Sequence, residues 1–179
     1  MGSPAAQPQP DLVAWVEAAY AGHFDYVWGL LGRLGVPPAS LDDATQDVFV
    51  VLYRKRAQFR RESHVRTLLH GIAINIGRRA RANLARDRLD PITGPLPTGA
   101  PSPEAQAEQR SELERLDVYL RTLSAEQREV FVLTEVAGLT APEIARLLSI
   151  KLNTVYSRLR LARKTIASCI AADTRRSAR

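Results

Sequence analysis

The amino-acid sequence predicts an all-α protein with two small helical domains joined by a flexible, proline-rich linker. Apolar residues recur at three- and four-residue intervals in both halves of the chain, and no segment alternates as strands do. Five of the eleven prolines fall within residues 88–103, together with two glycines, and this composition excludes a packed helix there. At 179 residues, the chain can form two domains close to the lower size limit for independent folding.

The N-terminal domain, residues 11–87, is expected to be a small bundle of helices, identified by three apolar faces. The first face comprises Phe24, Val27, Trp28, Leu31 and Leu34. The segment from Gly35 to Pro38 ends this helix, and Ser40 or Asp42 can cap the next one. The second face comprises Leu41, Ala44, Val48, Val51 and Leu52. Ser63 opens a third helix, whose inward face comprises Val65, Leu68, Leu69, Ile72, Ala73 and Ile76.

The C-terminal domain, residues 104–170, begins with two predicted helices. The face of the first comprises Leu113, Leu116, Leu120 and Leu123. Ser124 and Gln127 have the spacing of a capping box, which opens a second helix that runs toward Gly138.

A helix-turn-helix motif is predicted to follow. Thr140 caps a short helix that tolerates Pro142 in its first turn, and Asn153 caps a final helix after a short turn. The buried face of the final helix comprises Val155, Leu159, Ala162 and Ile166. Residues 171–179 are expected to form a mobile basic tail, with no further domain after Ile170.

Charge is distributed in alternating blocks along the chain. Residues 1–50 carry a balance of −5, residues 51–90 carry +8, residues 91–150 carry −4 and residues 151–179 carry +7, which sum to the net charge of +6. Two basic blocks separated by an acidic one suggest two surfaces that face a polyanion. Solvated helix faces and a basic tail would give the same pattern, and charge alone favours neither interpretation.

Catalysis, metal binding and membrane insertion are not indicated by the sequence. The three histidines lack the spacing of metal ligands, and Cys169 has no second cysteine. We find no Gly-rich phosphate loop, no nucleophile motif and no paired carboxylates in an apolar setting. No apolar run approaches the ~20 residues of a membrane span, and no signal peptide opens the chain. We therefore expect a cytoplasmic protein that is not an enzyme and needs no metal or cofactor.

The final helix carries the sharpest local signal. Its core face leaves a polar and basic set outward, namely Tyr156, Ser157, Arg158, Arg160, Arg163 and Lys164. Arginines near the start of a recognition helix can bind guanine edges in the major groove, whereas later basic residues reach phosphates. A solubilising face is the alternative, but the preceding helix and turn favour DNA.

Two surfaces of the first domain are weaker candidates. Its basic block suits unstacked bases and phosphates, and comprises Phe59, Arg60, Arg61, His64, Arg66, Asn75, Arg78, Arg79 and Arg81. Taken alone, Phe59 is more simply a core or loop anchor and Asn75 a packing residue. The second helix presents an acidic face around Asp43 and Asp47, which can dock a basic partner or simply face solvent.

Taken together, the ordered motifs resemble a known family. They are the segments Asp42–Phe49, Thr67–Asn75, Leu123–Phe131, Glu143–Ala145 and Thr154–Arg163. In this order, and with the linker between them, they resemble bacterial RNA polymerase sigma factors of the extracytoplasmic-function (ECF) type, in the sigma-70 family. Such factors contain only a region-two and a region-four domain.

The resemblance implies a transcription initiation factor that binds core RNA polymerase and directs it to promoter DNA. The implied contacts with the clamp helices of the polymerase β′ subunit are Asp43, Gln46, Asp47 and Phe49. The implied contacts with the melted −10 element are Phe59, Arg60, Arg61, Ser63, Asn75, Arg78 and Arg79. The −35 element would be read as duplex by Thr154, Tyr156, Ser157, Arg158, Arg160, Arg163 and Lys164. An anti-sigma factor is a further implied partner.

The chain departs from the family pattern at four positions. Leu68 stands where tryptophan is usual and Arg79 where aspartate is frequent, both within the segment implied for promoter melting. Asn153 replaces a common glycine, and Leu161 stands where a basic residue is frequent. A conventional helix-turn-helix regulator, whose first module dimerises or senses a ligand, is the alternative function. A helical adaptor without a nucleic-acid role is a third.

Overall fold

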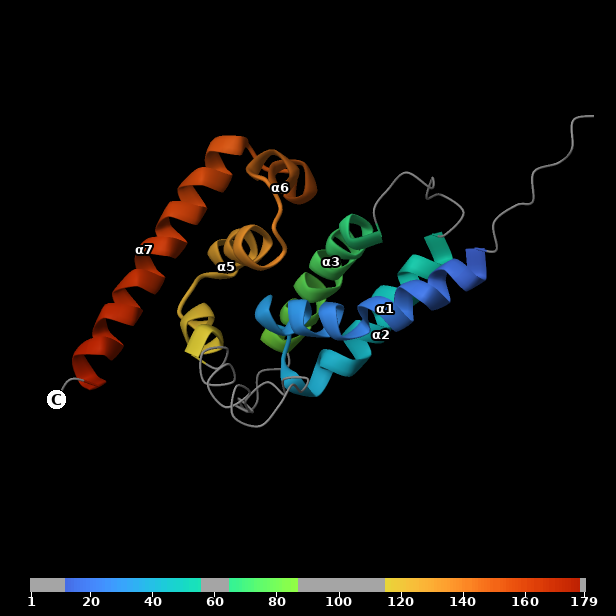
Figure 1. The fold of residues 1–179 in the computed structure, drawn as a ribbon, viewed down its shortest axis with the longest axis horizontal. Coiled ribbons are helices and arrows are strands. Elements are labelled where there is room, and N and C mark those ends of the chain that lie inside the picture. The colour runs from blue at the N-terminus through green and yellow to red at the C-terminus, as the bar shows by residue number, and fades with distance from the viewer. Residues whose placement is uncertain (1–11, 56–64, 87–114, 178–179) are drawn as a thin grey trace, which may run out of the picture.

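The computed structural model describes residues 12–55, 65–86 and 115–177, and in these ranges it contains helices and no strand. The N-terminal part consists of α1 (Leu12–Arg33), the short 3₁₀ helix η1 (Pro38–Ser40), α2 (Leu41–Lys55) and α3 (Val65–Arg86). The C-terminal part consists of a helix over residues 115–121, α5 (Ala125–Phe131), the π-helical segment η3 (Val132–Val136), α6 (Ala141–Leu148) and α7 (Leu152–Ser177). The all-α fold class is therefore confirmed (Figure 1).

The first three long helices bury the apolar faces that periodicity predicts. Fully buried leucines of α1, α2 and α3 meet in one core, among them Leu31, Leu52 and Leu69. Several expected residues are only partly buried, namely Phe24, Trp28, Val51, Val65 and Leu68. The indole Nε1 of Trp28 donates a hydrogen bond to Asp42 Oδ1 at 2.9 Å and so joins α1 to the start of α2.

Local capping sets the start of α5. The Ser124 hydroxyl accepts a hydrogen bond from the Gln127 backbone N–H, and the Gln127 side chain accepts one from the Ser124 N–H, both at 3.3 Å. The predicted capping box is thus present. The helix does not run as a plain α-helix toward Gly138, because it widens into the π-helical turn η3 after Phe131.

The helix-turn-helix consists of α6, a tight turn and α7. Thr140 begins α6 as predicted, with its backbone N–H donating to Glu143 Oε2 at 2.8 Å. Ser149 takes a left-handed conformation with φ of 54° and ends α6. The predicted cap at Asn153 is wrong, because α7 begins at Leu152 and places Asn153 in its first turn. Residues 171–177, expected to belong to a basic tail, continue α7 to Ser177.

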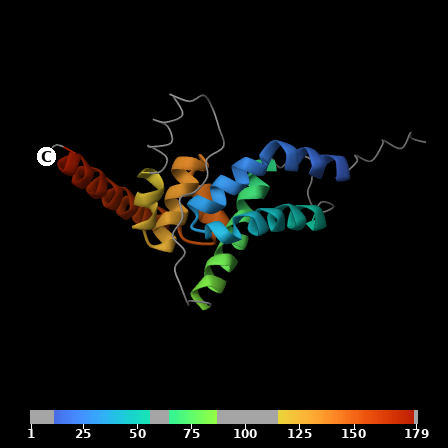
Figure 2. The ribbon, with the colours of Figure 1, turned by 90° about the horizontal axis from the view of Figure 1, so that it is seen from below.

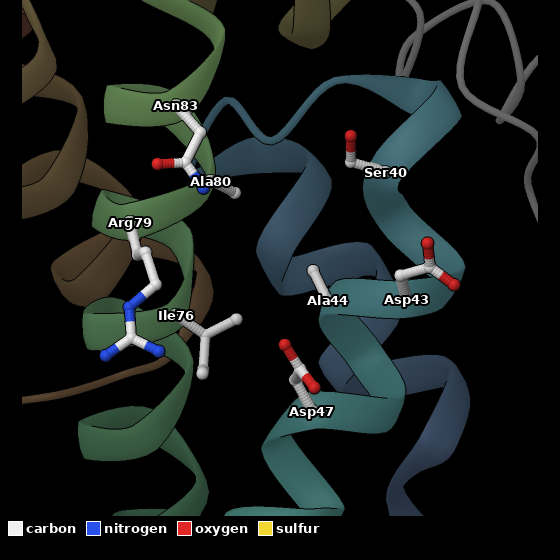
Figure 3. Close-up of a pocket in the computed structure, with 8 residues that line it drawn as sticks. All are labelled: Ser40, Asp43, Ala44, Asp47, Ile76, Arg79, Ala80 and Asn83. Carbon is white, nitrogen blue, oxygen red and sulfur yellow. The ribbon is translucent and has the colours of Figure 1, made fainter.

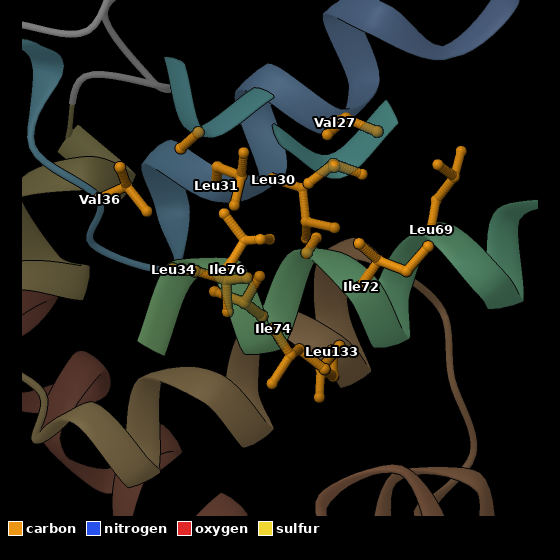
Figure 4. Close-up of a cluster of buried hydrophobic side chains, with 14 of the residues drawn as sticks. Val27, Leu30, Leu31, Leu34, Val36, Leu69, Ile72, Ile74, Ile76 and Leu133 are labelled. Atoms are coloured by element: carbon orange, nitrogen blue, oxygen red, sulfur yellow. The ribbon is translucent and has the colours of Figure 1, made fainter. Parts of the chain in front are cut away.

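The two helical groups pack against each other, with α3 facing α5 and α6 (Figures 1 and 2). One hydrophobic cluster includes buried residues of both groups. Figure 4 shows Ile74 of α3 pointing toward Leu133 of η3, away from the α1 side of the core. Gly71 permits close approach at the same interface, since a Cβ there would lie 3.3 Å from Leu147 Cδ1 of α6. Helical periodicity alone predicted no such packing between the two groups.

Candidate functional site

The outer face of α7 presents most of the side chains predicted to meet duplex DNA. Val155, Leu159 and Ala162 are buried against the domain. The opposite face leaves five predicted residues exposed, namely Tyr156, Ser157, Arg160, Arg163 and Lys164. Thr154 and Arg158 are half-buried at the edge of this face. The turn at Ser149 positions the whole row, because it sets the direction in which α7 leaves α6.

Arg163 already has an ionic partner within its own domain. Its Nε and Nη2 atoms donate to Glu135 Oε1 at 3.0 and 2.6 Å, and both side chains are well exposed. Exposed pairs of this kind contribute only about 0–1 kcal/mol, so a phosphate can replace the carboxylate at little cost. Glu135 was not singled out from the sequence, because it lies 28 residues from its partner.

The second basic surface lies on α3. Asn75, Arg78 and Arg79 are exposed and lie three and four residues apart, which places them on adjoining parts of one helix side. Arg78 is nevertheless bound to Glu129 of α5, and this hydrogen bonding is the main reason that the pKa of its guanidinium is raised. Four further residues predicted for this site, Phe59, Arg60, Arg61 and Ser63, lie outside the described residues.

The acidic face of α2 has an apolar groove beside it. Asp43, Gln46 and Asp47 are exposed, whereas Phe49 is buried. The Phe49 ring lies edge-on to Tyr20, with centroids 4.9 Å apart, so it contributes to the floor of the groove rather than to a free surface. The groove has a volume of about 510 Å³ and is lined by Tyr20, Gln46, Phe49, Val50, Tyr53 and Arg54.

Sequence reasoning missed most of the residues that line this groove. Tyr20, Val50 and Tyr53 are large apolar side chains that are more than 40% exposed. Gln46, Val50 and Tyr53 follow one another at four and three residues, so they share a helix face. Apolar residues at this spacing on the polar side of an amphipathic helix are the signal that could have identified them.

A smaller pocket lies between the start of α2 and the end of α3. It has a volume of about 270 Å³ and is lined by Ser40, Asp43, Ala44, Asp47, Ile76, Arg79, Ala80 and Asn83. Figure 3 shows the carboxylates of α2 on one side and the guanidinium of Arg79 with the amide of Asn83 on the other. The predicted acidic face and the predicted basic face therefore border a common hollow, which their sequence positions did not indicate.

His70 is a buried polar residue near the contact between the two helical groups. Its Nε2 atom lies 2.6 Å from the Tyr26 hydroxyl, and the Arg66 guanidinium lies over the Tyr26 ring. Burial is the largest cause of the lowered pKa of His70, Arg66 lowers it further, and Glu143 of α6 opposes the shift. Among the described residues, no cluster of three or more histidine, cysteine or carboxylate side chains could hold a metal ion. No helix in the same ranges has the length and hydrophobicity to cross a membrane.

Comparison with known proteins identifies relatives of one kind. Residues 113–166 match the family described as "Sigma-70, region 4". The RNA polymerase sigma factor CnrH of Cupriavidus metallidurans is 32% identical over 148 residues, which cover 78% of each chain. The ferric citrate uptake sigma factor FecI of Escherichia coli is 30% identical over 142 residues, covering 78% of this chain and 81% of FecI.

Solved structures of similar fold support the same comparison. CnrH in complex with the cytosolic domain of CnrY has 26% identity and a TM-score of 0.65, with 90% of each chain covered. The sigma factor RpoE of Bartonella quintana, in complex with the anti-sigma factor NepR, has a TM-score of 0.68 and covers 88% of this chain and 97% of RpoE. At 20% identity, that second likeness concerns the fold alone.

Proposed function

Since the chain belongs to the ECF sigma factors of the sigma-70 family, and so acts in transcription initiation through RNA polymerase, we propose that it binds core RNA polymerase and contacts promoter DNA through two separate surfaces. Sigma factors are regulatory, so nucleotidyl transfer belongs to the polymerase. The observation that carries the proposal is the pair of exposed basic rows, one on α3 and one on α7, in different domains.

The α7 row reads the −35 element as intact duplex. Its first exposed residues, Tyr156, Ser157 and Arg160, together with Arg158, reach base edges in the major groove. Arg163 and Lys164, one to two turns farther along, bind phosphates of the same groove. The left-handed turn at Ser149 and the buried face of α7 support this assignment, because they hold the row on a rigid scaffold.

The α3 row engages the −10 element as melted strand. Asn75, Arg78 and Arg79 combine an amide with two guanidinium groups, which suits unstacked bases and phosphates. Phe59, Arg60, Arg61 and Ser63, which lie outside the described residues, supply the remaining contacts. Extruding a base from the duplex costs a few kcal/mol, which stacking and phosphate contacts recover.

The exposed face of α2 docks on the β′ clamp helices of the polymerase. Asp43, Gln46 and Asp47 provide an acidic rim, and the groove over Phe49 supplies apolar area beside it. Acidic side chains beside an apolar groove fit a partner with basic and apolar side chains. An anti-sigma factor is a second partner. Among the proteins of similar fold, RpoE is in complex with the anti-sigma factor NepR, and CnrH is in complex with the cytosolic domain of CnrY.

A transcription assay tests the proposal directly. Sigma-free core polymerase, this protein and a genomic promoter library are combined, and run-off transcripts are scored. Transcripts that depend on the added protein are the expected result. Sequence-specific duplex binding without transcripts would instead support a conventional helix-turn-helix regulator, and absence of both would remove any nucleic-acid role.

A further inference from the structure

A buried carboxylate joins the two domains. Glu129 of α5 is 3% exposed, yet both of its oxygens accept hydrogen bonds from arginines of α3. Arg78 donates through Nε to Oε1 at 3.0 Å and through Nη2 to Oε2 at 2.8 Å. Arg81 donates through Nη2 to Oε1 at 2.5 Å. The bidentate geometry of Arg78 is the strongest form of a carboxylate–guanidinium contact.

The two arginines differ in how firmly they are held. Arg81 is 18% exposed in its side chain, and its Nη1 atom also donates to the Leu34 carbonyl at the end of α1. The Arg78 side chain is 43% exposed, and it pairs with Glu129. Arg78 can therefore turn to solvent or to a ligand, whereas Arg81 is fixed on the N-terminal domain.

Apolar contacts also join the two domains. Gly71 allows α3 to approach Leu147, and Ile74 is directed toward Leu133. Burial of a charged carboxylate is unfavourable unless partners compensate it, so Glu129 stays in this position only while the arginines accompany it. The ionic triad of Glu129, Arg78 and Arg81 thus adds a charged contact to the apolar contacts that join the two domains.

We propose that Arg78 and Arg81 form a phosphate-binding fork for promoter DNA, and that Glu129 occupies this fork when the domains are closed. A guanidinium pairs with a phosphate in the same bidentate way as with a carboxylate. Arg78 adjoins Asn75 and Arg79 on the proposed −10 face, so a DNA strand on that face reaches the fork. DNA and the C-terminal domain then compete for the same two side chains. The inference rests on the proposed function for the identity of its ligand.

Glu129→Gln is the variant that tests the fork, because it keeps the shape of the side chain and removes its charge. Ala21 of α1 and Ala171 of α7 are both exposed, and they are replaced by cysteine for dye labelling in a Cys169→Ser background. Energy transfer between the dyes reports on domain separation. Fluorescence anisotropy with a mixed-sequence single-stranded oligonucleotide reports on phosphate binding. We expect Glu129→Gln to lower the transfer efficiency and to tighten oligonucleotide binding several-fold.

The chain offers a matched control in Glu135→Gln. Glu135 belongs to the same domain and also pairs with an arginine, but its partner Arg163 lies in that domain too. The two variants change net charge equally. Glu135→Gln should therefore keep the transfer efficiency of the parent protein. Because Glu135→Gln also releases Arg163, any gain in its oligonucleotide affinity should disappear when Arg163→Gln is added. An equal gain that survives Arg163→Gln would overturn the fork, because net charge would then explain the effect.

If circular dichroism shows that Glu129→Gln does not fold, a second variant that separates the domains keeps the test decisive. Gly71→Met pushes α3 away from Leu147 without altering any charge, and should reproduce both changes. Adding Arg78→Gln to either opened variant should abolish the gain in affinity. Unchanged transfer in the folded variants, or opening without tighter binding, would overturn the proposal. Neither readout uses polymerase, so a failure of promoter-directed transcription would be a separate result.

Discussion

His70 has a pKa that makes stability depend on pH. Its buried ring faces Tyr26, the cation of Arg66 and, from α6, the carboxylate of Glu143. Burial and Arg66 lower the pKa of His70 from 6.5, so below that pH the unfolded chain binds more protons than the folded one. The stability that the neutral His70 contributes is fully present above pH 6.5. It is lost as the pH falls through the lower pKa that His70 has in the folded protein.

Urea unfolding at pH values from about 7.5 down to about 5.5, the range in which histidines ordinarily titrate, measures this effect. His70→Leu should flatten the decline in unfolding free energy on acidification. Tyr26→Phe keeps the imidazole and should retain most of the decline. An identical decline in the parent protein and in His70→Leu would contradict the assignment.

Arg158 tests base reading by α7. It is half-buried at the edge of the exposed row, and its charge helps to lower the pKa of Glu126, after the hydrogen bonds at the start of α5. Arg158→Ala should weaken binding to a preferred −35 duplex by about 1–3 kcal/mol and relax the preference at one position. Lys164→Ala should weaken all sequences about equally and reduce the salt dependence. Wild-type selectivity in Arg158→Ala would remove it from the reading set.

Among the elements, α5 depends on its cap. The Ser124 hydroxyl satisfies the Gln127 N–H, so Ser124→Ala should lower the unfolding free energy by about 1 kcal/mol. Ser168→Ala removes a hydroxyl from the exposed face of α7, where it bonds the Lys164 carbonyl, and should change stability far less. Thermal and urea unfolding of both variants measure the difference. Equal losses would indicate that the capping box does not stabilise α5.

Elements were predictable where the signal was local. Ser124 and Thr140 carry their capping partners three residues away, so the sequence alone predicts both helix starts. Asn153 has the side chain of a good capping residue, but α7 begins one residue earlier at Leu152, so residue type alone does not locate this helix start. The π-helical turn η3 had no such local marker in the sequence.

The candidate surfaces, like the helices, were predictable where the signal in the sequence was local. Once Val155 and Leu159 are known to face the core, helical periodicity leaves the polar row of α7 outside. The partner of Arg78 could not be predicted, because Glu129 lies 51 residues away in another domain. Contacts between domains depend on how two finished surfaces fit, which the periodicity of either helix does not encode.

For the whole molecule, docking on the polymerase should be separable from folding. Asp47 is exposed on α2, so Asp47→Lys should weaken association with core polymerase while the helical circular dichroism spectrum stays unchanged. Asp25→Lys makes the same charge reversal at an exposed position of α1. Its association with core polymerase should be closer to that of the parent protein than to that of Asp47→Lys. Co-elution with core polymerase measures both. Wild-type association of Asp47→Lys would argue against an acidic docking face.

The two domains meet through buried apolar residues and through the ionic triad on α3. The Gly71 approach and the Glu129 triad lie on one side of α3, whereas the α2 groove lies on the outer side of the N-terminal domain. Occupation of the groove and separation of the domains therefore involve different surfaces. A partner on α2 need not displace α5, which leaves the domain contact to be broken by other means.

The π-helical turn η3 gives evolution a simple way to change this molecule. A residue advances an α-helix by roughly 100°, and a π turn holds one residue more than the regular pitch accommodates. Loss of a single residue between Val132 and Val136 would let the regular pitch resume and would leave the segment after Ala137 in nearly its present direction. The length of the chain can therefore change by one residue within this turn without redirecting α6 and α7 and without alteration of any side chain in the α7 row.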